Sequence, residues 1–281
     1  MNFNTSIYEN RRKLARPFLV AHRGVCGANI PCNTLLGYKV AIEQGADVVE
    51  IDVSKSKDGK FFVFHPGMEP RYIGENKFLW EHTASEIEQM SLLNCDGVPT
   101  HYRVPTLSET LALLKDKAYI NVDKFWTDIA GITAEIRKAG VEKQVIVKTP
   151  VEEKYFAEVE KYAPDFMFMP LARHVDDVSE KLRGRNINFI GMEALFSSEC
   201  DEIASADYVR SMHERGLLVW VNAIVYNEQD VVSAHLTDDV SLECGGDAGW
   251  GKLISRGYDF IQTDWLLSLQ AYMRAKNAEV M

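Results

Sequence analysis

The chain has 281 residues, a formal net charge of −10, 46% hydrophobic residues and 26% charged residues. These fractions lie near globular averages and exclude wholesale disorder. The acidic balance disfavours a protein that binds nucleic acid or anionic membranes, because such binding depends on positive surface potential. A single α/β barrel commonly reaches this length, so we expect one domain over residues 1–281.

The cysteines and the N-terminal segment indicate a reducing compartment. The five cysteines show no C-x-x-C spacing, which indicates neither a zinc site nor a disulfide framework. The first residues lack the apolar core of a secretory signal, and no later stretch is long and uncharged enough to span a bilayer. We therefore predict a cytoplasmic protein without stable membrane association, although a chain whose signal had been removed would look the same. The sequence does not indicate the oligomeric state.

Short apolar runs alternate with amphipathic segments along the chain. Eight runs predict strands: Phe18–Ala21, Val48–Val53, Ala118–Val122, Val145–Val147, Phe166–Met169, Phe189–Met192, Leu217–Val221 and Phe260–Ile261. Between them, apolar residues recur at helical spacing, as in Leu107/Leu111/Leu114, Ile129/Ile132/Ile136, Tyr155/Val159/Tyr162 and Leu266/Leu269/Met273. This alternation predicts an α/β fold, and about eight repeats favour a closed (β/α)₈ TIM barrel. An open doubly wound sheet is the alternative, but no G-x-G-x-x-G follows the first strand.

Two stretches interrupt the alternation. Residues 67–104 read as a small insertion after the hairpin of the second strand, lying over one mouth of the barrel. Its capping box, Thr83-Ala-Ser-Glu86, predicts one short helix, and Thr106-Leu-Ser-Glu109 caps the helix that resumes the alternation. Residues 227–251 are rich in Asp and Gly, which predicts a mobile loop.

Catalytic groups of such barrels lie where strands end, so the polar residues after each apolar run are candidates. The first strand ends in His22-Arg23-Gly24, although a lone histidine there is more often a packing residue. In the second strand, Glu50 and Asp52 share one face because strand side chains alternate. Two close carboxylates suit Mg²⁺ or Ca²⁺, and the alternative is a solvated, salt-bridged strand end.

A hairpin brings a second histidine to the same mouth. Asp58-Gly59 between apolar runs is a turn signal, so residues 61–64 should fold back beside the second strand and deliver His65. Two histidines and two carboxylates around one opening are what a metal-assisted acid/base site requires.

Later strand ends add further candidates. Asp123 is a possible third metal ligand, while Lys124 and Lys148 are candidate phosphate ligands, though a lysine at a strand end is usually a solvated charge. Glu193 either faces the barrel lumen or is a buried carboxylate whose oxygens are hydrogen-bonded in the core. Four aromatic residues lie at or just past strand ends, and most such residues pack in the core or rim while one or two line a substrate pocket; they are Trp126, Phe196, Trp220 and Trp265. We select Trp220 as the pocket candidate.

These segments resemble the glycerophosphodiester phosphodiesterase family. The resemblance rests on His22-Arg-Gly, Pro31-Cys-Asn-Thr34, Gly45-Ala-Asp47, Glu50-Ile-Asp52, Lys57-Asp-Gly59 and Phe64-His65, in the family's order and approximate spacing. It continues at Val104-Pro-Thr-Leu107, Val219-Trp-Val-Asn222 and Gly257 to Asp264. Residues 127–216 are similar to the family only in rhythm.

The resemblance implies a barrel enzyme that releases glycerol phosphate and an alcohol from a small-molecule glycerophosphodiester. His22 and His65 would be the acid and the base, and Glu50, Asp52 and Asp123 would hold Mg²⁺ or Ca²⁺. Arg23 would stabilise the negative charge of the phosphate, because its guanidinium presents forked hydrogen-bond donors.

The chain departs from the family pattern at two places. Cys32 stands where the family usually has a glutamate before Asn-Thr, which removes a carboxylate close to the site. The family's third strand usually carries Glu-x-Lys, whereas Asp123 and Lys124 are adjacent and would diverge on a regular strand. Lys148 is therefore the alternative phosphate ligand. Both departures suggest a subgroup with an adjusted pocket.

Metal-dependent glycerophosphodiester hydrolysis is thus the leading hypothesis. A phospholipase D-like activity on lysolipids is an alternative that needs exposed apolar surface near the mouth. A non-catalytic phosphate-ester binding protein is another, since the pattern is broken in two places. A metallo-amidohydrolase would need an H-x-H pair in the first strand, which is absent.

Overall fold

The structure, a computed structural model, describes residues 1–175, 178–225, 227 and 229–280, with side chains up to residue 276. Its centre is a curled parallel sheet with the strand order β8-β7-β6-β2-β1-β12-β11-β10-β9. The strands of this sheet are β1 Phe18–Ala21, β2 Val48–Lys55, β6 Tyr119–Asp123, β7 Val145–Val147, β8 Met167–Phe168, β9 Leu171–Ala172, β10 Gly191–Ala194, β11 Leu218–Asn222 and β12 Phe260–Thr263. All eight predicted strands are present, and β9 is an additional short one.

The two ends of the strand order meet, so the sheet closes into a barrel. The Phe168 amide of β8 donates to the Asn188 carbonyl at 3.0 Å, and the Ile190 amide donates to the Phe168 carbonyl at 3.1 Å. These parallel bonds join β8 to the residues that lead into β10. The (β/α)₈ prediction is confirmed.

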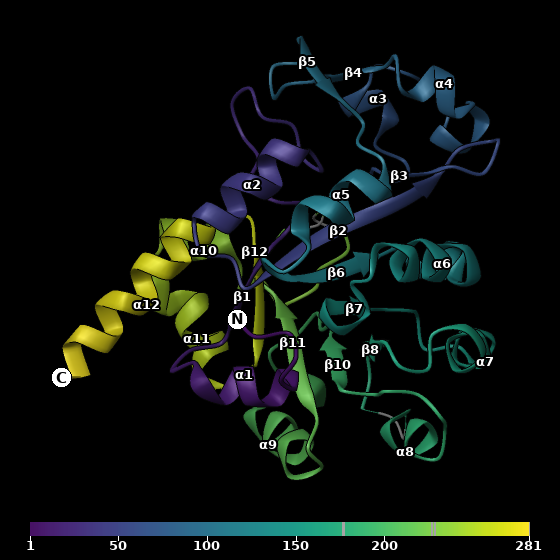
Figure 1. Cartoon of the computed structure of the whole chain (residues 1–281). Coiled ribbons are helices and arrows are strands. Elements are labelled where there is room, and N and C mark those ends of the chain that lie inside the picture. The colour runs from purple at the N-terminus through teal and green to yellow at the C-terminus, as the bar shows by residue number, and fades with distance from the viewer. Residues whose placement is uncertain (176–177, 226, 228, 281) are drawn as a thin grey trace.

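Helices surround the barrel (Figure 1). They are α1 Ile7–Lys13, α2 Leu35–Glu43, α5 Leu107–Leu114, α6 Ile129–Ala139, α7 Glu153–Tyr162, α8 Val178–Arg183, α9 Ala206–Glu214, α10 Asp238–Glu243, α11 Trp250–Ser255 and α12 Leu266–Val280. Helix α1 covers the end where the strands begin, with Ile7 buried in the inner core and Asn10 bonded to the Tyr119 hydroxyl at 2.7 Å. The opposite end remains available for a site. Within the described residues no helix is long and apolar enough to cross a membrane.

Strand pleating sorts the side chains into two layers. Residues such as Leu19, Val49 and Ile51 pack outward against the helices. The alternate residues point inward, and along β2 they change from apolar Val48 to acidic Glu50 and Asp52. The same change along the other strands gives the barrel an apolar floor and a polar mouth.

The insertion contains more structure than predicted. Its capping box forms around Thr83, and α4 Ala84–Ile87 follows it. The insertion also holds α3 Glu69–Tyr72, the 3-10 helix η1 Leu79–Glu81 and an antiparallel pair, β4 Ser91–Leu93 with β5 Pro99–Arg103. Asp96-Gly97, a turn signal in the sequence, lies between the two strands. The hairpin β3 Phe61–Val63 pairs with β2 as predicted.

The prediction of a mobile loop over residues 227–251 is wrong for its C-terminal half. Its C-terminal half forms α10, the 3-10 helix η5 Gly246–Ala248 and α11, and residue 228 lies outside the described residues. Thr237 caps α10, and the Asp238 carboxylate accepts bonds from the Trp250 indole at 2.7 Å and the Thr263 hydroxyl at 2.8 Å. Thr237 and Asp238 therefore serve as a helix cap and a buried hydrogen-bond partner, whereas Asp239 and Asp247 are exposed.

Candidate active site

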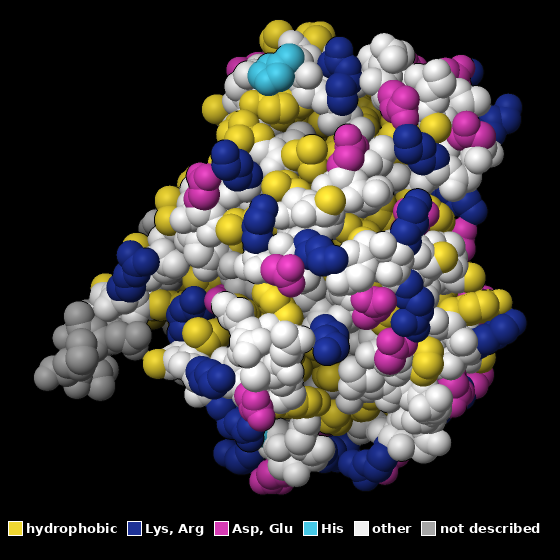
Figure 2. Space-filling view, in the orientation of Figure 1, with side chains coloured by type: hydrophobic (Ala, Val, Ile, Leu, Met, Phe, Trp, Pro, Cys, Tyr) yellow, Lys and Arg dark blue, Asp and Glu magenta, His cyan; other side chains and the backbone are white. Residues whose placement is uncertain are grey.

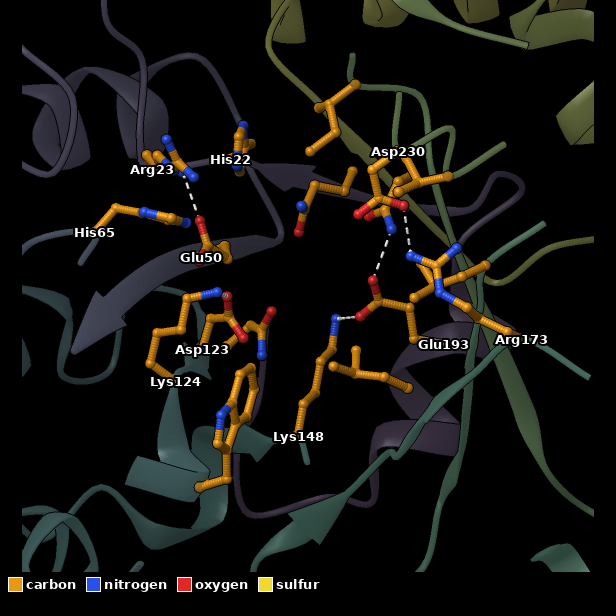
Figure 3. Close-up of a pocket in the computed structure, with 18 residues that line it drawn as sticks. His22, Arg23, Glu50, His65, Asp123, Lys124, Lys148, Arg173, Glu193 and Asp230 are labelled. Atoms are coloured by element: carbon orange, nitrogen blue, oxygen red, sulfur yellow. Dashed lines mark hydrogen bonds and ion pairs between the residues drawn. The ribbon is translucent and has the colours of Figure 1, made fainter. Parts of the chain in front are cut away.

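A cavity of about 260 Å³ opens where the barrel strands end (Figure 3). The residues that line it are His22, Arg23, Glu50, His65, Asn121, Asp123, Lys124, Trp126, Lys148, Leu171, Arg173, Glu193, Leu195, Asn222, Ile224, Asp230, Val232 and Gln262. Most of the residues predicted from the sequence are therefore brought together. Asp52 lies against this set, and Trp220 lies beneath it.

The three predicted carboxylates converge. Glu50, Asp52 and Asp123 each offer an oxygen, and these oxygens lie within 4.8 Å of one another. The pairing of β2 with β6 explains this, since Asp52 is in register with Asp123. Within the described part of the chain, Oδ1 of Asp52 is buried without a hydrogen-bond partner. An unsatisfied buried carboxylate oxygen in an acidic cluster fits a cation ligand.

Burial and the adjacent Asp52 raise the pKa of Glu50 to about 8. The backbone amide of Arg23 donates to Oε2 of Glu50 at 2.8 Å, which fixes this carboxyl in the cavity. A divalent cation would favour the ionised form of Glu50, because it supplies positive charge at the place where the carboxylates repel each other.

The His22-Arg23-Gly24 segment forms a tight turn after β1. Arg23 has φ +56° and Gly24 has φ +81°, so both occupy the left-handed region. A side chain at position 24 would begin 2.8 Å from the Gly37 backbone, which explains why glycine stands there. The turn places Nε of Arg23 3.0 Å from Oδ2 of Asp52.

His22 is held as a cation. Its Nδ1 lies 2.8 Å from Oδ1 of Asp264, which follows β12. Burial alone would lower the pKa of His22, but the Asp264 carboxylate outweighs it and raises the pKa to about 9. His22 is therefore protonated near neutral pH and can act as a general acid.

The pKa of His65 is shifted in the opposite direction. Its Nδ1 donates to the Pro66 carbonyl at 2.8 Å, which leaves Nε2 as the basic nitrogen of a neutral ring. Burial lowers the pKa of His65 below its ordinary value. The pKa values of the two imidazoles are therefore shifted in opposite directions, and both side chains line the cavity.

Asp123 and Lys124 both reach the cavity although they are adjacent, which corrects the expectation that they diverge. Strand β6 ends at Asp123, and Lys124 turns the chain with φ +59°. Nζ of Lys124 lies 3.0 Å from Oδ2 of Asp123 and 5.1 Å from the centre of the Trp126 ring. The neighbouring carboxylates raise the pKa of Lys124 against the effect of burial, so it stays charged.

Lys148 is engaged on the cavity floor. It forms a buried ion pair with Glu193, which also accepts a bond from the Asn222 amide at 2.6 Å. Trp220 is fully buried, and its ring centre lies 3.2 Å from Nζ of Lys148. Trp220 is not among the described residues that line the cavity, so it supports Lys148 from below.

Several residues of this site are not among those predicted from the sequence. Asp264 lies beyond the predicted strand, which ends at Ile261, whereas β12 continues to Thr263. Asn33 donates to Oδ2 of Asp52 at 2.9 Å from a loop that gives no strand-end signal. Arg173 and Asp230 form an ion pair on the far wall; Arg173 lies in the region that resembles the family only in rhythm, and Asp230 lies in the Asp- and Gly-rich stretch 227–251.

Comparison with known proteins identifies the family. The model of the glycerophosphoryl diester phosphodiesterase family matches residues 22–233. The chain belongs to this family. The match includes His22, His65 and the three carboxylates of the cavity.

Relatives and solved structures agree with this assignment. A glycerophosphodiester phosphodiesterase of Caldanaerobacter subterraneus subsp. tengcongensis is 28% identical over 148 residues, which cover 52% of this chain and 54% of that protein. The alignment thus spans about half of that relative. A glycerophosphoryl diester phosphodiesterase from Parabacteroides distasonis has a TM-score of 0.75 at 17% identity, covering 97% of this chain and 93% of that one. An Oleispira antarctica phosphodiesterase in complex with the product sn-glycerol-3-phosphate has a TM-score of 0.68 at 17% identity, covering 96% and 100% of the two chains. These two structures share the fold of this family member.

Proposed function

We propose that this protein hydrolyses glycerophosphodiesters to glycerol phosphate and an alcohol, with a divalent cation at Glu50, Asp52 and Asp123. The proposal rests on one observation: two histidines with pKa values shifted in opposite directions lie beside one carboxylate cluster. The family assignment and the product complex of the Oleispira antarctica phosphodiesterase support the substrate class.

The residues present fit a hard cation. All three donors are carboxylates, the preferred ligands of Mg²⁺ and Ca²⁺, and Oδ1 of Asp52 lacks another partner among the described residues. Bound here, such a cation would polarise a phosphoryl oxygen and offset the charge that develops on it.

The histidines supply the proton transfers. His65, neutral with its basic Nε2, accepts the proton of the attacking hydroxyl group or water. His22, protonated through Asp264, donates a proton to the oxygen of the departing alcohol. After this step His65 holds an extra proton and His22 lacks one, so the site resets when His65 releases a proton to water and His22 takes one up from water.

Lys124 rather than Lys148 is the phosphate ligand in this proposal. Lys124 lies beside the carboxylate cluster and keeps its charge. Lys148 is paired with Glu193, and burial lowers its pKa. Arg23 contributes a second fixed positive charge next to Asp52.

Metal removal tests this function. We expect EDTA to abolish release of glycerol phosphate from choline, ethanolamine, inositol and glycerol diesters, and Mg²⁺ or Ca²⁺ to restore it. Asp123→Asn should raise the cation concentration needed for half-maximal rate by about tenfold or more, because it removes one charged ligand.

Asp207→Asn is the matched control, since it removes an exposed carboxylate on α9. It should leave the cation requirement unchanged. Full turnover in EDTA would overturn the metal role, and absence of turnover on every diester with either cation would overturn the function.

A further inference from the structure

Cys26 and Cys32 face each other across the turn that follows Arg23. Between them the chain folds back, because the backbones of Gly27 and Ile30 exchange hydrogen bonds of 3.0 and 2.9 Å. The two Sγ atoms lie 2.7 Å apart, closer than unbonded sulfur atoms ordinarily approach, and both thiols are half-buried. A disulfide has an S–S length of about 2.05 Å, so the two sulfur atoms already lie close to bonding distance.

The two thiols differ in reactivity. The contact with the Cys26 thiol, the Tyr72 hydroxyl at 3.8 Å and the nearby Arg23 charge outweigh burial and lower the pKa of Cys32 to about 7. The same contact raises the pKa of Cys26. Cys32 is therefore the better source of thiolate, the form of cysteine that reacts with oxidants.

The remaining cysteines provide a contrast. Cys95, Cys200 and Cys244 are exposed and lie after β4, before the 3-10 helix η4 Glu202–Ala204 and after α10, respectively. They have solvent access comparable to or greater than that of the pair. Selective reaction of Cys26 with Cys32 would therefore reflect their mutual placement and not their exposure.

We propose that Cys26 and Cys32 form a redox modification site, which a peroxide oxidises to an intramolecular disulfide. The Cys32 thiolate attacks a peroxide oxygen, the O–O bond breaks, and Cys32 becomes a sulfenic acid while the peroxide is reduced to an alcohol or water. The Cys26 sulfur then attacks the sulfenic sulfur, the S–O bond breaks, and the Cys26 proton leaves with the hydroxyl as water. A dithiol reductant returns both thiols by exchange.

The bond would act next to the catalytic cavity. Asn33, which follows Cys32, donates to Asp52, and Thr34 caps α2. Oxidation also removes the Cys32 thiolate beside Arg23, so the cavity becomes less negative. This consequence rests on the proposed function: KM for an anionic glycerophosphodiester should fall by about twofold to fivefold on oxidation, as expected for the loss of one partly screened charge.

Peptide mapping of the whole folded protein tests the site without any activity. After treatment with hydrogen peroxide and blocking of free thiols, we expect a disulfide-linked peptide joining Cys26 to Cys32 and reversal by dithiothreitol. The Cys26→Ser and Cys32→Ser variants, checked for native circular dichroism, should yield no such linkage.

Peroxide doses that oxidise Cys95, Cys200 or Cys244 while Cys26 and Cys32 remain free thiols would overturn the proposal. A KM equal in the oxidised and reduced proteins would contradict the charge effect. Because mapping requires no substrate, failure of the proposed hydrolase function would leave the result of the mapping experiment interpretable.

Discussion

The pKa values of the two imidazoles of the cavity are shifted in opposite directions by their surroundings. Asp264 holds the pKa of His22 at about 9, whereas His65 contacts a carbonyl oxygen and burial lowers its pKa. A pH window follows from these directions. The proposed mechanism needs neutral His65 and protonated His22, so it predicts that activity rises with pH through the lowered pKa of His65 and falls through about pH 9.

Asp264→Asn tests the origin of the upper limb. Removing the carboxylate leaves burial to lower the pKa of His22, so the fall in kcat/KM should begin at lower pH than in the parent protein. The pH dependence of kcat/KM measures this. Asp239→Asn, which removes an exposed carboxylate at the start of α10, should leave the limb in place. An unshifted limb in Asp264→Asn would mean that this carboxylate does not set the protonation of His22.

Some side-chain positions of the site could be predicted from the sequence, and others could not. The same-face placement of Glu50 and Asp52 followed from strand alternation alone and was predicted. The position of Lys124 depends on φ +59°, a backbone region that lysine rarely adopts and that no pattern signals. A regular strand would direct the Lys124 side chain away from that of Asp123. The turn at Lys124 instead brings both side chains to the cavity.

At the scale of elements, the strands position the site because each runs from apolar to polar along its inward face. The sequence allowed this prediction, since the apolar runs and the polar residues that end them are both local features. The helices of residues 237–255 were not predicted, although Thr237 serves as a cap and Asp238 as a buried hydrogen-bond partner. Composition alone does not distinguish such residues from those of a solvated loop.

Strand β10 offers a test of the barrel wall. A Cβ at Gly191 would lie 1.9 Å from the Leu218 carbonyl oxygen in the neighbouring strand β11. Gly191→Ala should therefore separate the strands and lower the free energy of unfolding by about 3 kcal/mol or more, the range of severe overpacking. Urea denaturation followed by circular dichroism would measure it.

Gly184→Ala is the matched control, because no atom lies within 4 Å of a Cβ added there. It should change stability by about 0.5 kcal/mol or less. Equal stability of the two variants would show that β10 and β11 do not pack as closely as described.

On the scale of the whole molecule, closure of the barrel brings together groups that are distant in sequence. His22 bonds to Asp264, 242 residues away, and Lys148 bonds to Glu193, 45 residues away. The alternation of strands and helices predicted this closure, and the family assignment agrees with it. The pairing of specific partners was not predictable, because it depends on the final register between strands.

The insertion and the barrel also share one surface. The apolar cluster beneath the insertion includes Phe62 and Phe64, which belong to the hairpin segment that leads to His65. The upper part of the molecule in Figure 2 carries exposed hydrophobic and charged side chains over this region. The position of His65 therefore depends on packing of the insertion as well as on the hairpin.

The most direct test of the account is the dependence of each histidine variant on the leaving group. Rates of glycerophosphocholine hydrolysis should fall at least about 10²-fold in both His22→Ala and His65→Ala. With a p-nitrophenyl glycerophosphodiester, whose leaving group departs without a proton, His22→Ala should regain most of its rate while His65→Ala stays impaired. Full activity in either variant on the choline ester, or equal impairment of His22→Ala on both substrates, would contradict the account.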